Sequence, residues 1–492
     1  VLYGETQPLY PLRASLNPRG VGPALRVDIT PSDAKQFGLS AQLVDVSVEP
    51  WRGAPGLTGV YGSLSMNERE GRVVVDALSP VTLNFPMIYQ QPLRFSQIQA
   101  QVDWQVDGQR YLISSGDIVA HSSDSDAQYG GRFAVNGGVG DSEEATQLML
   151  NLGVSQAPAN ELLQYIPYTA PQSLLDWVSA AEISGAVNNG VFIYNGSVRS
   201  EEGEYRSINA YFDVADAALT YYEGWPSVAN TVATVFVEND RVSVEVDSGE
   251  SSGLTFSDGS VDVYYGEGSP YVAVNGDIDG DLAQLFQFLV TAPLPVDLSS
   301  YIGSWQSSGM LRDANIDLYI PLRGDFLQQF TIDAGLHLEN AALDMHNIGI
   351  AVNNITGHLG FSDKAGLYSR DLRGSVWGSD LVAQLGDSQS GDVGLGDDLS
   401  ADTLQKQIAT SVTSANSAVN ASASAMGRVQ LQVSGEVAAH GLASWLDLPI
   451  MSFIEGRSQF DLNLLVDDSN TTLSVSSDLA GVALNFPDAM GK

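Results

Sequence analysis

A strand-like stretch that occurs twice constrains the fold of this chain more than any other feature. Residues 208–222 read INAYFDVADAALTYY and residues 332–345 read IDAGLHLENAALDM, so the copies start 124 residues apart. In both copies, apolar residues occupy even positions before a polar residue, Asp216 or Asn340, and odd positions after it. Side chains of a strand alternate between two faces, so this switch predicts two strand segments separated by a bulge. Asp and Asn both tolerate the bent backbone of a bulge.

A second repeated feature is a helical segment that ends in a glycine. Residues 158–181 predict two short amphipathic helices, divided by Pro167 and Pro171, before strands resume at Gly185. A second copy ends at Gly309, again 124 residues later, and a third spans residues 440–456. Each unit therefore consists of short helices, a glycine and several meandering strands, and such repetition favours an array of similar units over one closed domain.

The remaining patterns predict a mainly β fold of antiparallel strand meanders with short amphipathic helices at the repeat boundaries. Strands are expected at residues 25–29 and 43–48, with turns at 67–71 and at Asp107-Gly108, the latter a strong hairpin signal. A Gly/Asp-rich and then Ala/Ser-rich insertion predicts an extruded loop with one weak helix. We divide the chain into a strand-rich repeat (1–156), two helix-glycine-strand repeats (157–281 and 282–385), the insertion (386–427) and a partial third repeat (428–492).

The composition disfavours several classes of function. The chain has 59 Asp and Glu residues against 22 Lys and Arg, a formal net charge of −37, which would repel nucleic acids and anionic membrane surfaces. The absence of cysteine excludes disulfides, thiolate metal sites and cysteine nucleophiles. No apolar run approaches the length of a membrane-spanning helix, and the first residues lack signal-peptide features. We therefore expect any exporting or anchoring segment of the parent protein to lie outside this chain.

Motifs that carry chemistry are weak. Residues 275–286, NGDIDGDLAQLF, resemble the start of a calcium loop, but Phe286 occupies the position of the essential bidentate Glu. We favour a strand-to-helix turn with Asp281 as the helix cap. Trp177, Trp305 and Trp445 all lie in the helix-glycine segments and fit either core anchors or the lining of an apolar groove.

The histidines also give no site signature. None of the five has a partner four residues along a helix; they are His121, His337, His346, His358 and His440. His337 lies between Leu336 and Leu338 in a predicted strand and is expected to face solvent. Phosphate-binding and nucleophile-elbow motifs are missing as well. We predict no catalytic residue, no metal, no cofactor and no enzymatic activity.

The order of four segments resembles YhdP-type proteins of the AsmA-like superfamily. The segments are SLLDWVSAAEISGAV, AYFDVADAALTYYEGWPSVANTVATVFV, VNGDIDGDLAQLFQFLVTAPL and SSDLAGVALNFPDAMGK, and the likeness runs from about Leu57 to the C-terminus. The resemblance implies a long curled antiparallel sheet, open along one side like a trough, with an apolar inside and a polar outside. It also implies a protein of the Gram-negative periplasm, anchored in the inner membrane, that moves phospholipids toward the outer membrane. This chain would be an internal portion, and its Ala/Ser-rich insertion and strong acidity depart from the family.

The resemblance implies a non-catalytic apolar groove for phospholipid transport between the two membranes, and the residue pattern is compatible with it. A curved sheet with one apolar face and no second layer must meet something apolar, and acyl chains would serve. The expected partners are phospholipid acyl chains, with membrane contacts through regions outside this chain and no nucleic acid. The expected groove-lining residues are Phe212, Val214, Leu336, Leu338, Leu359 and Phe361. The alternative is a structural or adhesive extracellular β-repeat protein with a dry core, and an enzyme of unrecognised type ranks third.

Overall fold

The structure is a computed structural model of the 492-residue chain. Two compact units make up the chain: Val1–Glu223 with Val228–Val244, and Gly224–Ser227 with Glu245–Lys492. The structure describes residues 17–30, 33–51, 53–139, 145–198, 205–266, 268–292, 303–322, 331–346, 349–362, 365–386, 429–438, 440–441, 445, 453–466 and 471–484.

The described residues contain 26 strands, and strand β15 (Arg241–Ser251) contains the division between the units. The strands of the first unit are β1 (Arg19–Val21), β2 (Leu25–Thr30), β3 (Asp33–Val48), β4 (Gly56–Asn67), β5 (Glu70–Ala77), β6 (Val81–Asn84), β7 (Leu93–Asp107), β8 (Arg110–Ser115), β9 (Ile118–Ser122), β10 (Gln128–Gly138), β11 (Gln147–Pro158), β12 (Ser184–Ser197), β13 (Arg206–Leu219) and β14 (Val228–Glu238). Those of the second are β16 (Leu254–Tyr264), β17 (Tyr271–Asp281), β18 (Gln306–Pro321), β19 (Thr331–Met345), β20 (Ile350–Ser362), β21 (Gly366–Val376), β22 (Ser379–Leu385), β23 (Val429–Ala438), β24 (Ile454–Val466), β25 (Thr471–Ser477) and β26 (Val482–Leu484).

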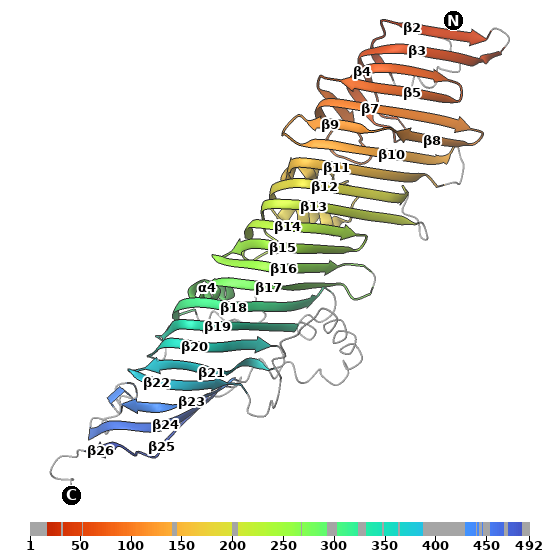
Figure 1. The fold of residues 1–492 in the computed structure, drawn as a ribbon. Helices are drawn as coiled ribbons and strands as arrows, with labels where there is room; N and C mark the ends of the chain where they lie inside the picture. Colours follow the sequence, from red (N-terminus) through yellow and green to blue (C-terminus); the bar gives the residue numbers. More distant parts are fainter. Residues whose placement is uncertain are drawn as a thin grey trace. The chain divides into compact units, whose positions relative to one another are not determined.

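The strands pair with their sequence neighbours in antiparallel ladders (Figure 1). In the first unit, β10 to β13 each pair with the next strand, whereas β7 pairs with four strands, β5, β6, β8 and β9. In the second, β16 to β24 pair successively, and β24 also pairs with β25 and β26. Asp107 ends β7 and Arg110 begins β8, as the Asp-Gly turn predicts. The predicted fold class, a mainly β protein of antiparallel meanders with short helices, is confirmed.

The predicted bulges at Asp216 and Asn340 are confirmed. Both residues have a left-handed backbone with φ of 51°. The pairing register shifts on either side of them, between Val214 and Ala217 in β13 and between Leu338 and Ala341 in β19. Neighbouring strands carry the same feature at Asn230, Asp258, Asp313 and Asn354, with φ between 47° and 52°. Because a bulge bends its strand and increases the twist, a series of them on successive strands curls a sheet.

The two repeated features of the sequence meet in space. A Cβ atom on Gly185 would lie 2.7 Å from Cα of Ala217, and one on Gly309 would lie 2.5 Å from Cα of Ala341. Both glycines have a positive φ, 114° and 122°. The glycine after each helical segment is therefore required because the bulged strand beside it passes too close for any side chain.

The helices follow the predicted positions. In the first unit they are α2 (Ala159–Leu162), the 3₁₀ turn η1 (Leu163–Tyr165) and α3 (Gln172–Ala180), with both prolines between η1 and α3. In the second, α4 (Leu282–Thr291) begins after Asp281, whose backbone N–H donates to Oε1 of Gln284 at 2.9 Å. The predicted helix cap at Asp281 is thus confirmed, and Asp277 and Asp279 lie in strand β17. Most of the third helical copy and residues 387–427 of the insertion lie outside the described residues.

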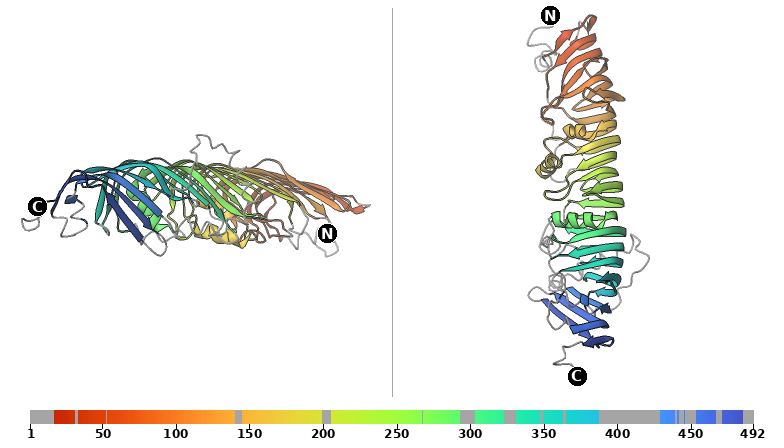
Figure 2. Two further views of the ribbon diagram at one scale, coloured as in Figure 1. Left: turned by 90° about the horizontal axis from the view of Figure 1, so that it is seen from below. Right: turned by 90° about the vertical axis from the view of Figure 1, so that its left-hand side faces the viewer.

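The helices of each unit lie on one face of its strands, which we call the helix-side face (Figure 2). In the first unit the hydroxyl of Tyr129 on β10 donates to Oε1 of Glu161 at 2.7 Å, and its ring centre lies 5.3 Å from that of Tyr165. In the second unit Leu282 of α4 is buried with Leu311 and Leu338 in one hydrophobic cluster. The opposite side of the strands is called the outer face below.

Candidate functional site

The helix-side face of β10 to β14 is an apolar surface. Antiparallel register aligns Tyr129 with residues of the next four strands, and every second residue along each strand points to the same side. The three resulting rows contain Tyr129, Val154, Gly190, Phe212 and Val235; then Gly131, Leu152, Phe192, Ala210 and Val237; then Phe133, Leu150, Tyr194 and Ile208. None of these fourteen residues carries a charge. In the row that follows along the strands, the one charged residue is Arg206.

Most of these side chains keep some contact with solvent. All of them are half-buried except Leu152, which is 40% exposed, and Gly190, which is buried. A Cβ atom on Gly190 would lie 2.7 Å from Cδ1 of Phe212 and 2.8 Å from Cγ1 of Val154. The absence of a side chain at Gly190 therefore leaves room for the Phe212 ring beside β12. The face is apolar, and the described part of the chain leaves its side chains partly exposed.

The outer face of the same strands is more polar. On this face, the row that lies between the second and third apolar rows along the strands contains Arg132, Asn151, Ile193, Asn209 and Glu238. Arg132 forms an ion pair with Asp117. Apolar residues occur there too. Tyr211 and Phe236 pair across β13 and β14 with ring centres 5.5 Å apart, and Tyr211 is 37% exposed. The two faces thus differ in the density of apolar side chains, with polar groups interrupting the outer one.

One end of the apolar surface is closed by η1. Tyr129 and Tyr165 contact Phe95 and the cluster of buried side chains around Val81 and Ile98. Burial raises the pKa of Tyr129, and Tyr165 and Glu161 add to the shift. Burial would raise the pKa of Glu161 as well, but hydrogen bonds, chiefly from Ser125 and Ser122, outweigh it and hold this pKa below the ordinary value. The carboxylate thereby stays ionised where the helical segment meets the strands.

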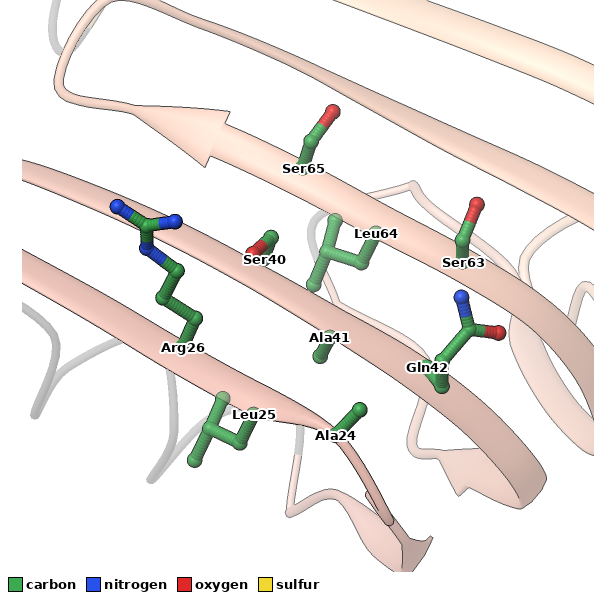
Figure 3. A pocket seen from close by; sticks show the side chains of 9 residues that line it. All are labelled: Ala24, Leu25, Arg26, Ser40, Ala41, Gln42, Ser63, Leu64 and Ser65. Carbon is green, nitrogen blue, oxygen red and sulfur yellow. The ribbon is translucent and has the colours of Figure 1, made fainter.

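The first strands show the same division between faces. A shallow pocket over β2, β3 and β4 is lined on one side by Leu25, Ala41 and Leu64, which are register partners, and on the other by serine, arginine and glutamine side chains (Figure 3). The apolar row continues through Val73 and Val102. The segregation therefore occurs on the first strands as well as on β10 to β14, and this pocket brings together no group of catalytic type.

In the second unit, part of the helix-side face lies under α4. Leu311 is 1% exposed and Leu338 is 5% exposed, both in the cluster with Leu282. Beside this covered part, register aligns Val261, Val274, Leu318 and Ile332, all of which are half-buried. The face therefore has a dry portion beneath the helix and an apolar portion that retains exposed surface.

The six residues predicted to line a groove lie on three strands. Phe212 and Val214 are on β13 in the first unit, and both are half-buried on the helix-side face. Leu336 of β19 pairs with Leu359 of β20, and Phe361 pairs with Ala334. Leu338 is buried under α4, whereas the other three residues of the second unit are half-buried.

Sequence reasoning did not single out the neighbours that complete the apolar rows. Val154, Phe192 and Val235 lie beside Phe212 through strand register. The alternation of apolar and polar residues along each strand indicated which side chains share a face. It did not indicate which residues lie opposite each other on neighbouring strands, because that register depends on loop lengths and bulges.

A comparison with protein-family models matches residues 5–492 to the family described as YhdP protein. The chain belongs to the YhdP family. The resemblance to YhdP-type, AsmA-like proteins is therefore confirmed, and it extends over nearly the whole chain. YhdP proteins are bacterial envelope proteins and are not known as enzymes. Neither the curated proteins nor the solved structures contain a match to this chain.

Two further properties bear on this member of the YhdP family. Among the residues that the structure describes, no helix is both long enough and apolar enough to cross a membrane. The same residues contain no group of three or more His, Asp or Glu side chains placed to hold a metal ion.

Proposed function

We propose that the helix-side face binds phospholipid acyl chains and provides a path for phospholipid transport between the inner and outer membranes. The chain would act as a periplasmic segment of a Gram-negative envelope protein, held at the inner membrane by a region outside this chain. The observation that carries the proposal is the set of three uncharged rows on β10 to β14, whose side chains the protein leaves partly exposed.

The physical argument rests on burial of hydrocarbon. Each CH₂ group transferred from water to an apolar surface contributes about 0.8 kcal/mol, so an acyl chain of ordinary length gains several kcal/mol on such a face. Within the three rows the side chains offer an acyl chain no fixed ionic partner, since none is charged. A hydrocarbon chain can therefore shift along the rows without breaking a specific polar contact.

Within this proposal the predicted residues have different roles. Phe212, Val214, Leu336, Leu359 and Phe361 retain exposed surface and would contact the acyl chain. Leu338 lies under α4 and would support the surface from below. The helices would cover part of the face and leave the remainder to lipid.

Lipid that copurifies with the protein tests the proposal. The double variant Phe212→Asp, Leu336→Asp places one carboxylate on the helix-side face of each unit, and we expect bound phospholipid per protein to fall strongly. The matched control is Tyr211→Asp, Met310→Asp, which places the same charges at exposed positions of the outer face, where Tyr211 is 37% and Met310 43% exposed. Phospholipid would be quantified by mass spectrometry after detergent-free purification, with circular dichroism to compare folding.

The outcomes separate this function from a dry structural or adhesive repeat. Loss of lipid in the helix-side variant and retention in the control supports transport along the face. Purification of the unaltered protein without phospholipid, or equal lipid in both variants, contradicts it.

A further inference from the structure

Two histidines meet on the outer face of the second unit. His337 on β19 and His358 on β20 are direct register partners, and their ring centres lie 4.5 Å apart with 58° between the ring planes. The neighbours of His337 along β19, Leu336 and Leu338, contribute to the cluster beneath α4, so the imidazoles point away from the helix-side face. The pair is 21 residues apart in sequence, a spacing that no helical metal motif uses.

A carboxylate fixes the ring of His358. Its Nδ1 atom lies 2.9 Å from Oδ2 of Asp371, and Oδ1 of Asp371 accepts a hydrogen bond from the backbone N–H of His358 at 2.9 Å. Both carboxylate oxygens of Asp371 therefore contact His358, one at its ring and one at its backbone. Histidines that ligate metals characteristically bond their other ring nitrogen to a carboxylate, which orients the ring and raises its basicity. His358 is arranged in this way with its Nε2 atom left for another partner.

His337 has an unmet requirement. Among the side chains that the structure describes, its Nδ1 atom is the one buried polar atom without a hydrogen-bond partner. Leaving such a group unsatisfied disfavours the folded state. A ligand bound by both imidazoles would give Nδ1 of His337 a partner.

We propose that His337 and His358 bind one divalent transition-metal ion, of the zinc, nickel or copper class, with Asp371 as the positioning residue of His358. Metal–nitrogen bonds of about 2.0–2.1 Å put each ring centre roughly 3.2 Å from the metal, so nitrogen–metal–nitrogen angles of about 90–110° place the two ring centres about 4.5–5.2 Å apart. The observed separation of 4.5 Å falls at this limit. Imidazole suits these metals, and water completes the coordination because the site has two protein ligands.

Some of the surrounding charges favour binding of a cation and others oppose it. Arg312 is the β18 partner of His337 and opposes a cation, but its guanidinium forms an ion pair with Glu339, with 3.5 Å between Nε and Oε2. Asp371 supplies a negative charge on the other side of the pair. The formal net charge of −37 raises the local concentration of cations around the whole molecule. Abundant carboxylates also bind metals weakly, so the test needs a control that distinguishes imidazole from carboxylate ligands.

Calorimetric titration of the protein with Ni²⁺ at pH 7.5, where a free imidazole is mostly neutral, tests the site. We expect one saturable site that is lost in His337→Asn and in His358→Asn, and about 10–100-fold weaker binding in Asp371→Asn, the usual effect of removing an orienting carboxylate. The matched control is His346→Asn, since His346 also contacts a carboxylate, with 3.3 Å between its Nδ1 and Oδ1 of Asp344. This control should bind as the unaltered protein does. Equal affinity in all five proteins would overturn the proposal.

Electron paramagnetic resonance with one equivalent of Cu²⁺ gives a second readout that a folding defect cannot imitate. Coupling to two imidazole nitrogens is expected in the unaltered protein and in His346→Asn, and loss of this two-nitrogen coupling is expected in His337→Asn and in His358→Asn. A spectrum of oxygen ligands alone in the unaltered protein would assign binding to surface carboxylates and overturn the site.

Discussion

Replacement of Gly309 by alanine is expected to destabilise the second unit by about 4 kcal/mol. The added Cβ would lie 2.5 Å from Cα and 2.7 Å from Cβ of Ala341, both on a bulged strand that cannot withdraw without breaking its ladder. The backbone φ of 122° is strained for any L-residue besides. The two destabilising effects add, because the steric clash involves the neighbouring strand and the backbone strain lies within residue 309 itself.

Hydrogen-exchange mass spectrometry of β18 and β19 measures this effect. A loss of 4 kcal/mol corresponds to roughly 1000-fold faster exchange of the protected amides. The control is Gly378→Ala, where φ is 75° but no atom lies within 4 Å of the added Cβ. This variant carries strain alone and should cost about 1 kcal/mol. Similar exchange in the two variants would show that the approach to Ala341 does not limit position 309.

Leu311→Ala is expected to cost the second unit about 3 kcal/mol. Leu311 is 1% exposed and lies in the cluster that joins α4 to the strands, so its truncation leaves a cavity beneath the helix. The control is the adjacent Met310→Ala, which removes a side chain that is 43% exposed on the outer face and should cost well under 1 kcal/mol. Exchange in α4 and β18 should accelerate roughly 100-fold in Leu311→Ala only. An equal response of the two variants would place the core of this unit elsewhere.

Much of the fold could be predicted because local sequence determines it. The parity switch at Asp216 and Asn340 predicted bulges, and both residues have the left-handed backbone that a bulge uses. Pro167 and Pro171 predicted the break between the helical segments, and Asp281 the start of α4. Each of these features depends on residues within one turn or strand, where side-chain chemistry limits the backbone directly.

Contacts between strands could not be predicted in the same way. The sequence showed Gly309 and Ala341 as members of two separate repeats, but only the register of β18 with β19 brings them within contact. His337 and His358 illustrate the same limit. Alternation indicated that His337 faces away from the leucines, yet its pairing with His358 depends on the turn between β19 and β20 and on the bulge at Asn340. Long-range register is set by these cumulative offsets.

The contact between acyl chains and the helix-side face is the central claim, and site-specific photo-crosslinking tests it most directly. Benzoylphenylalanine would replace Phe212 in one protein and Tyr211 in another, so the two probes differ by one residue and occupy opposite faces of β13. After irradiation of cells that express the parent protein, intact mass measurement detects covalent phospholipid. We expect a phospholipid adduct at position 212 and none above background at position 211. No adduct at position 212, or equal adducts at both positions, would contradict the account.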